Sequence, residues 1–225
     1  GLGRWRMRTG LGDLNGWEAF TYGNPGDIPF SGDWDCDGTR TPGLYRQSDG
    51  YVYLRNGNDT GIADIQFFFG DPGDVPVPGD FDGDGCDTLS IYRPSTATFH
   101  IVNQLGSDDT GLGAADHSFV FGNVGDTPFS GDFDGDGVTE VGLHRASSGF
   151  VYFRNTLDTG IADLQFFYGD PGDVILAGDW DGDGDDTVAV FRPSNGTLYV
   201  NLENAPGVAD YELEIGPFAS AVVAR

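Results

Sequence analysis

Short hydrophobic stretches alternate along this chain with clusters of glycine, proline, aspartate and asparagine. The first series of such stretches covers 28–32, 42–46, 51–56 and 63–70. Short runs that are rich in β-branched and aromatic side chains and bounded by turn residues are typical of β-strands. The connection after the first run is rich in aspartate, and the second connection is a tight Gln-Ser-Asp-Gly turn. The pattern predicts one four-stranded antiparallel sheet.

This series occurs four times, and each copy carries the heptapeptide Gly-Asp-aromatic-Asp-x-Asp-Gly. The heptapeptides lie at 32–38, 79–85, 131–137 and 178–184. Their first aspartates are separated by 47, 52 and 47 residues. We therefore divide the chain into repeats at about 28–74, 75–126, 127–173 and 174–216. Repeats of this length indicate stacked supersecondary units, because one such sheet cannot bury both of its faces alone.

The two ends of the chain favour a ring over a linear stack. Trp5–Arg8 and Glu18–Gly23 resemble the third and fourth strands of another unit, and Ala221–Arg225 resembles its first strand. We predict a single all-β domain over 1–225, a β-propeller of four-stranded antiparallel blades. Five blades are favoured, with the closing blade built from 1–27 and 217–225. A four-bladed ring and an arc of a larger ring are the alternatives.

The composition agrees with this fold and narrows the range of partners. The chain has 37 Gly and 12 Pro, which disfavour helices, and 17 Phe, which suit strands. Its net charge of −25 repels a phosphate backbone, so nucleic-acid binding is not expected. No apolar run approaches the roughly 20 residues of a membrane span, and no signal-peptide core opens the chain. We expect a secreted or cell-surface segment that belongs to a larger chain.

The heptapeptides have the chemistry of calcium-binding loops. Ca²⁺ prefers six to eight oxygen ligands, and Asp-x-Asp-x-Asp-Gly supplies three carboxylates from alternate positions of a tight turn. The predicted carboxylate ligands are Asp33, Asp35, Asp37, Asp80, Asp82, Asp84, Asp132, Asp134, Asp136, Asp179, Asp181 and Asp183. The predicted backbone carbonyl ligands, at position 7, are those of Thr39, Cys86, Val138 and Asp185. A single loop of this kind could equally be an ordinary polar turn. Four loops at the same place in four repeats instead predict up to four calcium ions.

With these loops, the chain resembles the FG-GAP and VCBS-type repeats of integrin-α-like propellers, over about residues 20–216. The resemblance implies a calcium loop between the first two strands of each blade and a further ligand at position 9. That position holds Thr41, Thr88, Glu140 and Thr187. Water, or the neighbouring Asp87 and Asp186, would complete the shells that lack a carboxylate there. We expect the third loop to bind most tightly and the first, which has Arg40 beside it, least tightly.

A second recurring pair of charges surrounds each loop. Asp27, Asp74, Asp126 and Asp173 precede the first loop aspartate by six residues, and Arg46, Arg93, Arg145 and Arg192 follow it by thirteen. Antiparallel pairing of residue 32 with residue 42 would place Asp27 beside Arg46. This predicts an Asp–Arg pair within every blade. The alternative is that each aspartate binds the backbone of its own turn.

The two cysteines leave two states open. Cys36 and Cys86 belong to the first and second loops, which adjacent blades would place on the same rim. A disulfide would suit an oxidising compartment. Two free thiols are the alternative.

The remaining chemistry-bearing residues do not form a recognisable catalytic motif. His100, His117 and His144 share no ligand spacing, and His144 takes the strand position of Tyr45, Tyr92 and Phe191, as a packing substitute would. Aromatic residues precede the turns between repeats, namely Tyr22, Phe69, Phe121 and Tyr168. Ordinary packing between blades explains them best, and a glycan site on that face of the ring is the alternative.

We therefore expect a calcium-stabilised extracellular binding or adhesion scaffold without catalytic activity, whose partner is a protein or a glycan. A lectin with one shallow site per blade is the first alternative, because it would repeat equivalent residues in every blade. A carbohydrate-active enzyme that uses the central channel is the second, and it would need one asymmetric cluster.

Overall fold

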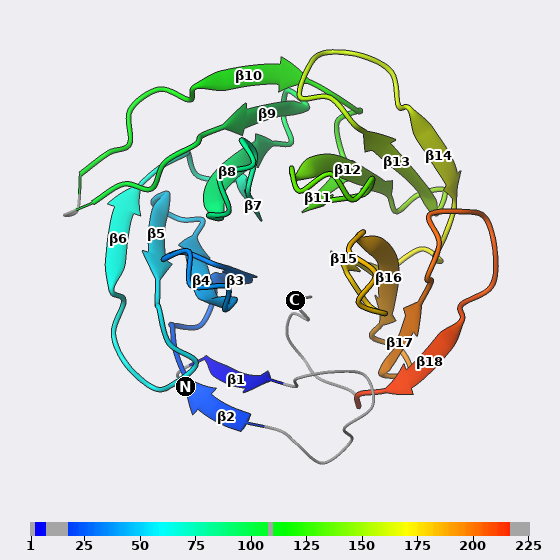
Figure 1. Ribbon diagram of the computed structural model, residues 1–225, viewed down its shortest axis with the longest axis horizontal. Coiled ribbons are helices and arrows are strands. Elements are labelled where there is room, and N and C mark those ends of the chain that lie inside the picture. The colour runs from blue at the N-terminus through cyan, green and yellow to red at the C-terminus, as the bar shows by residue number, and fades with distance from the viewer. Residues whose placement is uncertain (1–2, 8–17, 108–109, 217–225) are drawn as a thin grey trace.

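The computed structural model describes residues 3–7, 18–107 and 110–216, which form strands and turns and contain no helix. The strands make four sheets of four strands and one sheet of two. The sheets are arranged in a ring, with the first strand of each large sheet nearest the centre and the fourth at the outside (Figure 1). The predicted all-β propeller is confirmed. Nothing in the described part of the chain has the form of a helix that could cross a bilayer.

The four large sheets are the blades, and each follows the chain from its inner to its outer strand. Blade 1 comprises β3 (Ile28–Gly32), β4 (Thr41–Arg46), β5 (Tyr51–Leu54) and β6 (Ile65–Phe68). Blade 2 comprises β7 (Val75–Gly79), β8 (Thr88–Arg93), β9 (Thr98–Ile101) and β10 (His117–Val120). Blade 3 comprises β11 (Thr127–Gly131), β12 (Glu140–Arg145), β13 (Phe150–Arg154) and β14 (Leu164–Phe167). Blade 4 comprises β15 (Val174–Gly178), β16 (Thr187–Arg192), β17 (Thr197–Val200) and β18 (Tyr211–Glu214).

The smaller sheet stands where a fifth blade was expected. It pairs β1 (Arg4–Met7) with β2 (Glu18–Thr21) in antiparallel order, between blade 4 and blade 1 in the ring (Figure 1). Phe20 and Tyr22 pack from this sheet against Leu44 of blade 1. The described structure therefore has four complete blades and a two-stranded sheet. The expected closing strand, Ala221–Arg225, lies outside the described residues.

The hydrophobic cores lie at the junctions between blades, as expected for sheets that must bury both faces. One cluster joins Phe67 of blade 1 to Leu89 and Ile91 of blade 2, and two further clusters join blades 2 and 3 and blades 3 and 4. The four aromatic residues that precede the turns between repeats are all buried in these junctions: Tyr22, Phe69, Phe121 and Tyr168. Their interpretation as packing residues is confirmed.

The strand register in blade 1 differs by one residue from the prediction. Gly32 pairs with Thr41, and not with residue 42 as predicted, and Ile28 pairs with Tyr45. Pro42 has no N–H for the ladder, and Thr41 closes the loop instead by donating its hydroxyl to the Gly32 carbonyl at 3.3 Å. The observed register brings Asp27 directly beside Arg46.

Candidate metal centres

The aspartates of the four heptapeptides come together in four separate clusters, and Glu140 of β12 joins the third. The clusters are Asp33, Asp35 and Asp37; Asp80, Asp82 and Asp84; Asp132, Asp134, Asp136 and Glu140; and Asp179, Asp181 and Asp183. Each lies in the connection between the first and second strands of its blade. The repeat predicted from the sequence is therefore a repeat of the same acidic loop in three dimensions.

The spacing within each cluster fits one calcium ion. One oxygen from each residue lies within 4.8 Å of those of the other members. Calcium–oxygen bonds are about 2.3–2.6 Å long, so two ligands on opposite sides of an ion are about 5 Å apart. The donor set consists of carboxylate oxygens, which are hard ligands that suit Ca²⁺. The residues present fit a single hard cation in each loop.

The first aspartate of each loop shapes the loop by accepting backbone hydrogen bonds. In the third loop, Asp132 Oδ1 accepts from the Gly135 N–H at 2.8 Å, and Asp132 Oδ2 accepts from the Gly137 N–H at 2.9 Å. Asp80 and Asp179 accept from the two corresponding glycines of their own loops. A carboxylate that binds several backbone amides is held in a fixed orientation. The loops are therefore ordered by their own side chains.

The first loop has a cysteine where the other three loops have a glycine. Cys36 adopts a φ of 62°, and the equivalent Gly83, Gly135 and Gly182 have φ values of 73°, 72° and 83°. A left-handed backbone is easy for glycine and unfavourable for other residues, so this turn is strained. Cys36 forms a disulfide with Cys86 of the second loop, with a Cα–Cα distance of 4.8 Å. Of the two states left open by the sequence, the structure has the disulfide, and it joins two neighbouring candidate centres.

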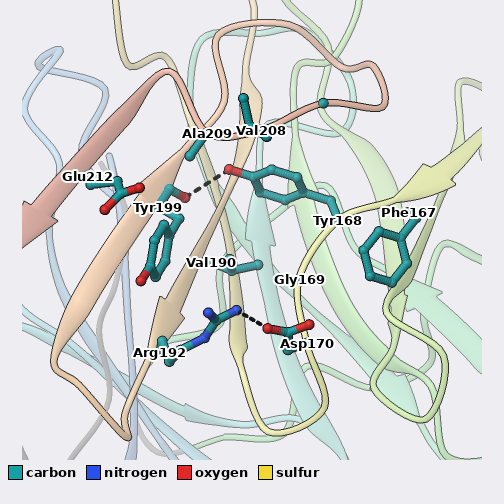
Figure 2. Close-up of a pocket in the computed structure, with 11 residues that line it drawn as sticks. Phe167, Tyr168, Gly169, Asp170, Val190, Arg192, Tyr199, Val208, Ala209 and Glu212 are labelled. Atoms are coloured by element: carbon teal, nitrogen blue, oxygen red, sulfur yellow. Dashed lines mark hydrogen bonds and ion pairs between the residues drawn. The ribbon is translucent and has the colours of Figure 1, made fainter.

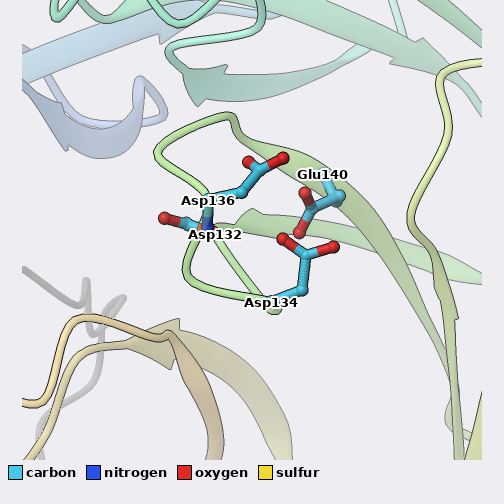
Figure 3. Close-up of side chains that lie close together, drawn as sticks. All are labelled: Asp132, Asp134, Asp136 and Glu140. Carbon is cyan, nitrogen blue, oxygen red and sulfur yellow. Dashed lines mark hydrogen bonds between the residues drawn. The ribbon is translucent and has the colours of Figure 1, made fainter.

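The third loop has the most complete ligand set. Glu140, the first residue of β12, points toward the three loop aspartates (Figure 3). Its carboxylate is buried and accepts a hydrogen bond from the Phe133 N–H at 2.7 Å. Burial raises the pKa of Glu140 to about 8, and the neighbouring aspartates contribute in the same direction. A bound cation would relieve both the burial penalty and the repulsion.

The threonines at the position of Glu140 are engaged with the backbone. The hydroxyl of Thr88 donates to the Val102 carbonyl at 2.6 Å, and that of Thr187 donates to the Asn201 carbonyl at 2.6 Å. Thr41 is likewise bound, to Gly32. Their roles as ligands stay predictions. The same is true of the backbone carbonyls at position 7, in Thr39, Cys86, Val138 and Asp185.

The fourth loop carries one carboxylate more than the sequence analysis assigned to it. A hydrogen bond from its side chain to Asp183 raises the pKa of Asp185 to about 6. The Asp185 N–H also donates to Asp183 Oδ1 at 3.3 Å, so this residue contacts a predicted ligand, although the prediction used its backbone carbonyl alone. Asp185 stands beside the cluster of Asp179, Asp181 and Asp183 and is not one of its members, so the third loop alone of the four has a fourth carboxylate in its cluster.

Each of the first three loops is held by two hydrogen bonds to the next blade, contacts that the sequence did not indicate; we call this arrangement a clamp. The Asp33 N–H donates to Asp87 Oδ2 at 2.8 Å, and the Asp87 N–H donates to the Asp33 carbonyl at 2.9 Å. Thr139 makes the same two contacts with Asp80, and Asp186 makes them with Asp132. The carboxylates of Asp87 and Asp186 thus hold the loops of the preceding blades. The sequence had suggested a different role for them, as ligands in their own loops.

Arg40 occupies the clamp position of blade 1. It forms an ion pair with Asp87 at 3.2 Å. Burial is the largest influence on Asp87 and raises its pKa, and Arg40 opposes that effect. The sequence held one indication of the clamps, because the clamp residues occupy the same position in each repeat: Arg40, Asp87, Thr139 and Asp186. Their partners, however, lie in another repeat.

The predicted Asp–Arg pair is present in all four blades. In blade 3, Arg145 Nε donates to Asp126 Oδ1 at 2.8 Å, and an NH2 group donates to Asp126 Oδ2 at 2.7 Å. Asp126 Oδ2 also accepts from the Asn123 N–H of its own turn at 2.9 Å, so both alternatives hold together. The other pairs are Asp27–Arg46, Asp74–Arg93 and Asp173–Arg192. These pairs join the turn between blades to the end of each second strand.

Comparison with known proteins does not assign the chain to a family. No protein-family model matches it, and no curated protein matches it. A solved structure that it resembles is that of the V. cholerae biofilm matrix protein Bap1, at 22% sequence identity and a TM-score of 0.36. The match covers 79% of this chain and 29% of Bap1, so the chain spans less than a third of that protein. The resemblance to FG-GAP and VCBS-type repeats stays a prediction.

Proposed function

We propose that this chain is a calcium-stabilised extracellular binding scaffold without catalytic activity. The observation that carries the proposal is the recurrence of one acidic cluster, with oxygens within 4.8 Å of one another, at the same place in all four blades. Three or four carboxylates at such a distance repel one another, and a divalent cation removes the repulsion. Calcium binding would therefore stabilise each loop.

The clamps explain how such an ion would stabilise the whole ring. The first aspartate of a loop is a proposed ligand, and its backbone also binds the next blade. An ion that orders this aspartate in one blade therefore supports the junction with the following blade. Stability in repeat proteins depends on such contacts between neighbours. Calcium would in this way act on blade stacking and not only on a local turn.

Two observations support the extracellular and non-catalytic parts of the proposal. The Cys36–Cys86 disulfide suits an oxidising compartment. The clusters of three or more acidic, histidine or cysteine ligands found in the described residues all lie at repeat-equivalent positions. An enzyme needs an asymmetric constellation at one place, whereas a scaffold repeats its parts.

Thermal unfolding with and without calcium tests the proposal. We expect the chelated chain to melt at a lower temperature than the calcium-loaded chain, and the melting temperature should keep rising as the calcium concentration exceeds the Kd, because the stabilisation grows with the logarithm of the ligand concentration. Magnesium, which prefers six ligands in a regular octahedron, should stabilise the chain less at equal concentration. Identical melting temperatures in chelator and in millimolar calcium would refute the proposal.

A further inference from the structure

Two hollows lie at corresponding blade junctions, away from the acidic loops. The blade 4 hollow, of about 320 Å³, lies between the end of β14 and blade 4 (Figure 2). The blade 1 hollow, of about 1000 Å³, lies between the N-terminal sheet and blade 1. Ten of the eleven residues that line the blade 4 hollow have a counterpart, at a constant offset of 146 residues, in the lining of the blade 1 hollow. The hollows are therefore a repeated feature of the fold.

The blade 4 hollow combines aromatic surface with polar groups. Phe167, which is 50% exposed, forms one side, and Tyr199 forms another with the Arg192 guanidinium 4.8 Å from its ring centre (Figure 2). Asp170, paired with Arg192 at 2.6 Å, and Glu212 contribute carboxylates. An apolar surface with a few placed polar groups is the usual composition of a small-molecule site.

The blade 1 hollow keeps part of this chemistry: Thr21 takes the position of Phe167 but does not line the hollow, and Asn24 takes the position of Asp170. Arg46 lies over the Tyr53 ring at 4.5 Å, as Arg192 does over Tyr199. Gln66 takes the place of Glu212, so the polar group is kept without its charge. The Tyr22 hydroxyl is buried and has no hydrogen-bond partner among the described residues, whereas its counterpart in blade 4 donates to a backbone carbonyl. Because this oxygen is buried, it marks a difference between the two hollows and is not a contact point for a ligand.

We propose that these two hollows bind neutral sugar residues of a glycan. A hexose offers an apolar C–H face to an aromatic ring and hydroxyls to the surrounding carboxylate, amide and guanidinium groups. The Gln66-for-Glu212 exchange indicates hydrogen bonding, not charge pairing, at that position. The net charge of −25 and the carboxylates at the rim disfavour anionic sugars. The inference rests on the proposed function as a binding scaffold and names its ligand class.

The other junctions provide internal comparisons. At the junction of blades 1 and 2, the long loop before β10 covers the outer strand β6: the Leu112 N–H donates to the Phe68 carbonyl at 2.9 Å, and Leu105 and Leu112 pack on the core. His100 replaces the stacked tyrosine there. We expect no sugar at that junction. The junction of blades 2 and 3 keeps Arg145 over Tyr152 at 4.6 Å, with Phe121 at the position of Tyr22.

The test is an NMR titration of the calcium-loaded chain with the methyl glycosides of glucose, galactose and N-acetylglucosamine, and with glucuronic acid as the anionic counterpart. At least one neutral glycoside should shift the amide signals of both hollows, with a Kd on the order of 1 mM for so small a ligand. Glucuronic acid should bind at least about tenfold more weakly.

Variants separate the blade 4 hollow from the rest of the chain. Gly207→Trp adds a ring at the rim, where a Cβ meets no atom within 4 Å, and should abolish the shifts at blade 4 but not at blade 1. Phe167→Ala should weaken binding there about tenfold. Val124→Trp adds the same ring at a 73% exposed turn position outside both hollows and should leave both sites unchanged.

The inference fails if the folded, calcium-loaded chain shows no saturable shifts at either hollow, if Gly207→Trp leaves the blade 4 shifts intact, or if glucuronic acid binds as tightly as the neutral glycosides. Calcium binding is measured on the same samples. Retained calcium stabilisation without sugar binding would refute this inference and leave the proposed function standing, whereas an absence of calcium stabilisation would refute the proposed function itself.

Discussion

Replacing Asp134 with asparagine should change the stability of the protein in opposite directions with and without calcium. Asp134 is exposed and lies with Asp132 and Asp136 in the third cluster, where one oxygen of each is within 4.8 Å of the others. The substitution keeps the shape of the side chain and an oxygen that accepts the Asn155 amide, now at 3.3 Å. It removes one negative charge from the cluster.

The magnitude follows from the spacing. Two unit charges 4.8 Å apart repel by about 0.9 kcal/mol in water-like surroundings, so two neighbours contribute about 2 kcal/mol. Part of this repulsion persists in the unfolded chain, because the three aspartates are close in sequence. In chelator, Asp134→Asn should therefore stabilise the protein by about 1 kcal/mol and raise the melting temperature by about 2–4 °C.

In calcium the sign reverses. A site at 100 times its Kd stabilises the folded state by about 2.7 kcal/mol, and a 100-fold weaker site contributes only about 0.4 kcal/mol at the same concentration. The unfolding free energy that Asp134→Asn gains from calcium should thus be smaller than that of the unaltered protein by about 2 kcal/mol, which corresponds to about 4–8 °C in melting temperature. Calorimetric melting in chelator and in calcium measures both numbers.

The control is Glu214→Gln, which removes one charge from an exposed position of β18 outside the clusters. It should leave the calcium-dependent gain unchanged. A lower melting temperature of Asp134→Asn in both conditions would show that Asp134 is merely a turn residue. An unchanged melting temperature in both conditions would refute the repulsion argument itself.

Three further predictions concern the clamps, the Asp–Arg pairs and the buried histidine. Thr139→Val removes the hydroxyl that accepts the Asp80 N–H at 3.0 Å and should lower the unfolding free energy in urea by about 1–3 kcal/mol, while Thr139→Ser, which keeps the hydroxyl, should cost less than half as much. Alanine substitutions at Asp126 and Arg145 should show a coupling energy of about 2–3 kcal/mol in a double-mutant cycle, because the pair is bidentate and the Asp126 side chain is 2% exposed. A coupling energy below about 0.5 kcal/mol would contradict the pairing. Burial lowers the pKa of His144, against an opposing influence of Asp173 and Asp126, so the unfolded state takes up a proton first as the pH falls and the unfolding free energy should drop below about pH 6.5. In unfolding experiments at about pH 7.5 and 5.5, His144→Phe should lack this part of the loss of stability. Equal losses in both proteins would disprove the assignment.

The sequence predicted the features that depend on a single repeat. The alternation of short apolar runs and turns gave the blades, because each sheet follows from local strand and turn preferences and from the need to bury two faces. The same holds for the acidic loops and for the Asp–Arg pairs, whose partners belong to one hairpin. The register was wrong by one residue because it depended on how Thr41 and Pro42 close the loop, which hydrophobic alternation does not specify.

The features that the sequence did not predict join different repeats. Asp87 lies 54 residues from Asp33, its clamp partner, and a single chain without a template does not show which loop it reaches. The sequence left the state of Cys36 and Cys86 open for the same reason, since a disulfide depends on the distance between two blades. The hollows also need two blades each, although their residues recur at a fixed offset that could have indicated them.

The central claim is that each acidic loop holds a calcium ion that stabilises the ring. Isothermal titration of the chelated chain with calcium tests it most directly, because it counts the ions. The account predicts saturable binding of up to four ions per chain, with the number reduced by one when Asp132, Asp134 and Asp136 are replaced together by asparagine. A titration without saturable heat, or a stoichiometry that this triple replacement leaves unchanged, would contradict it.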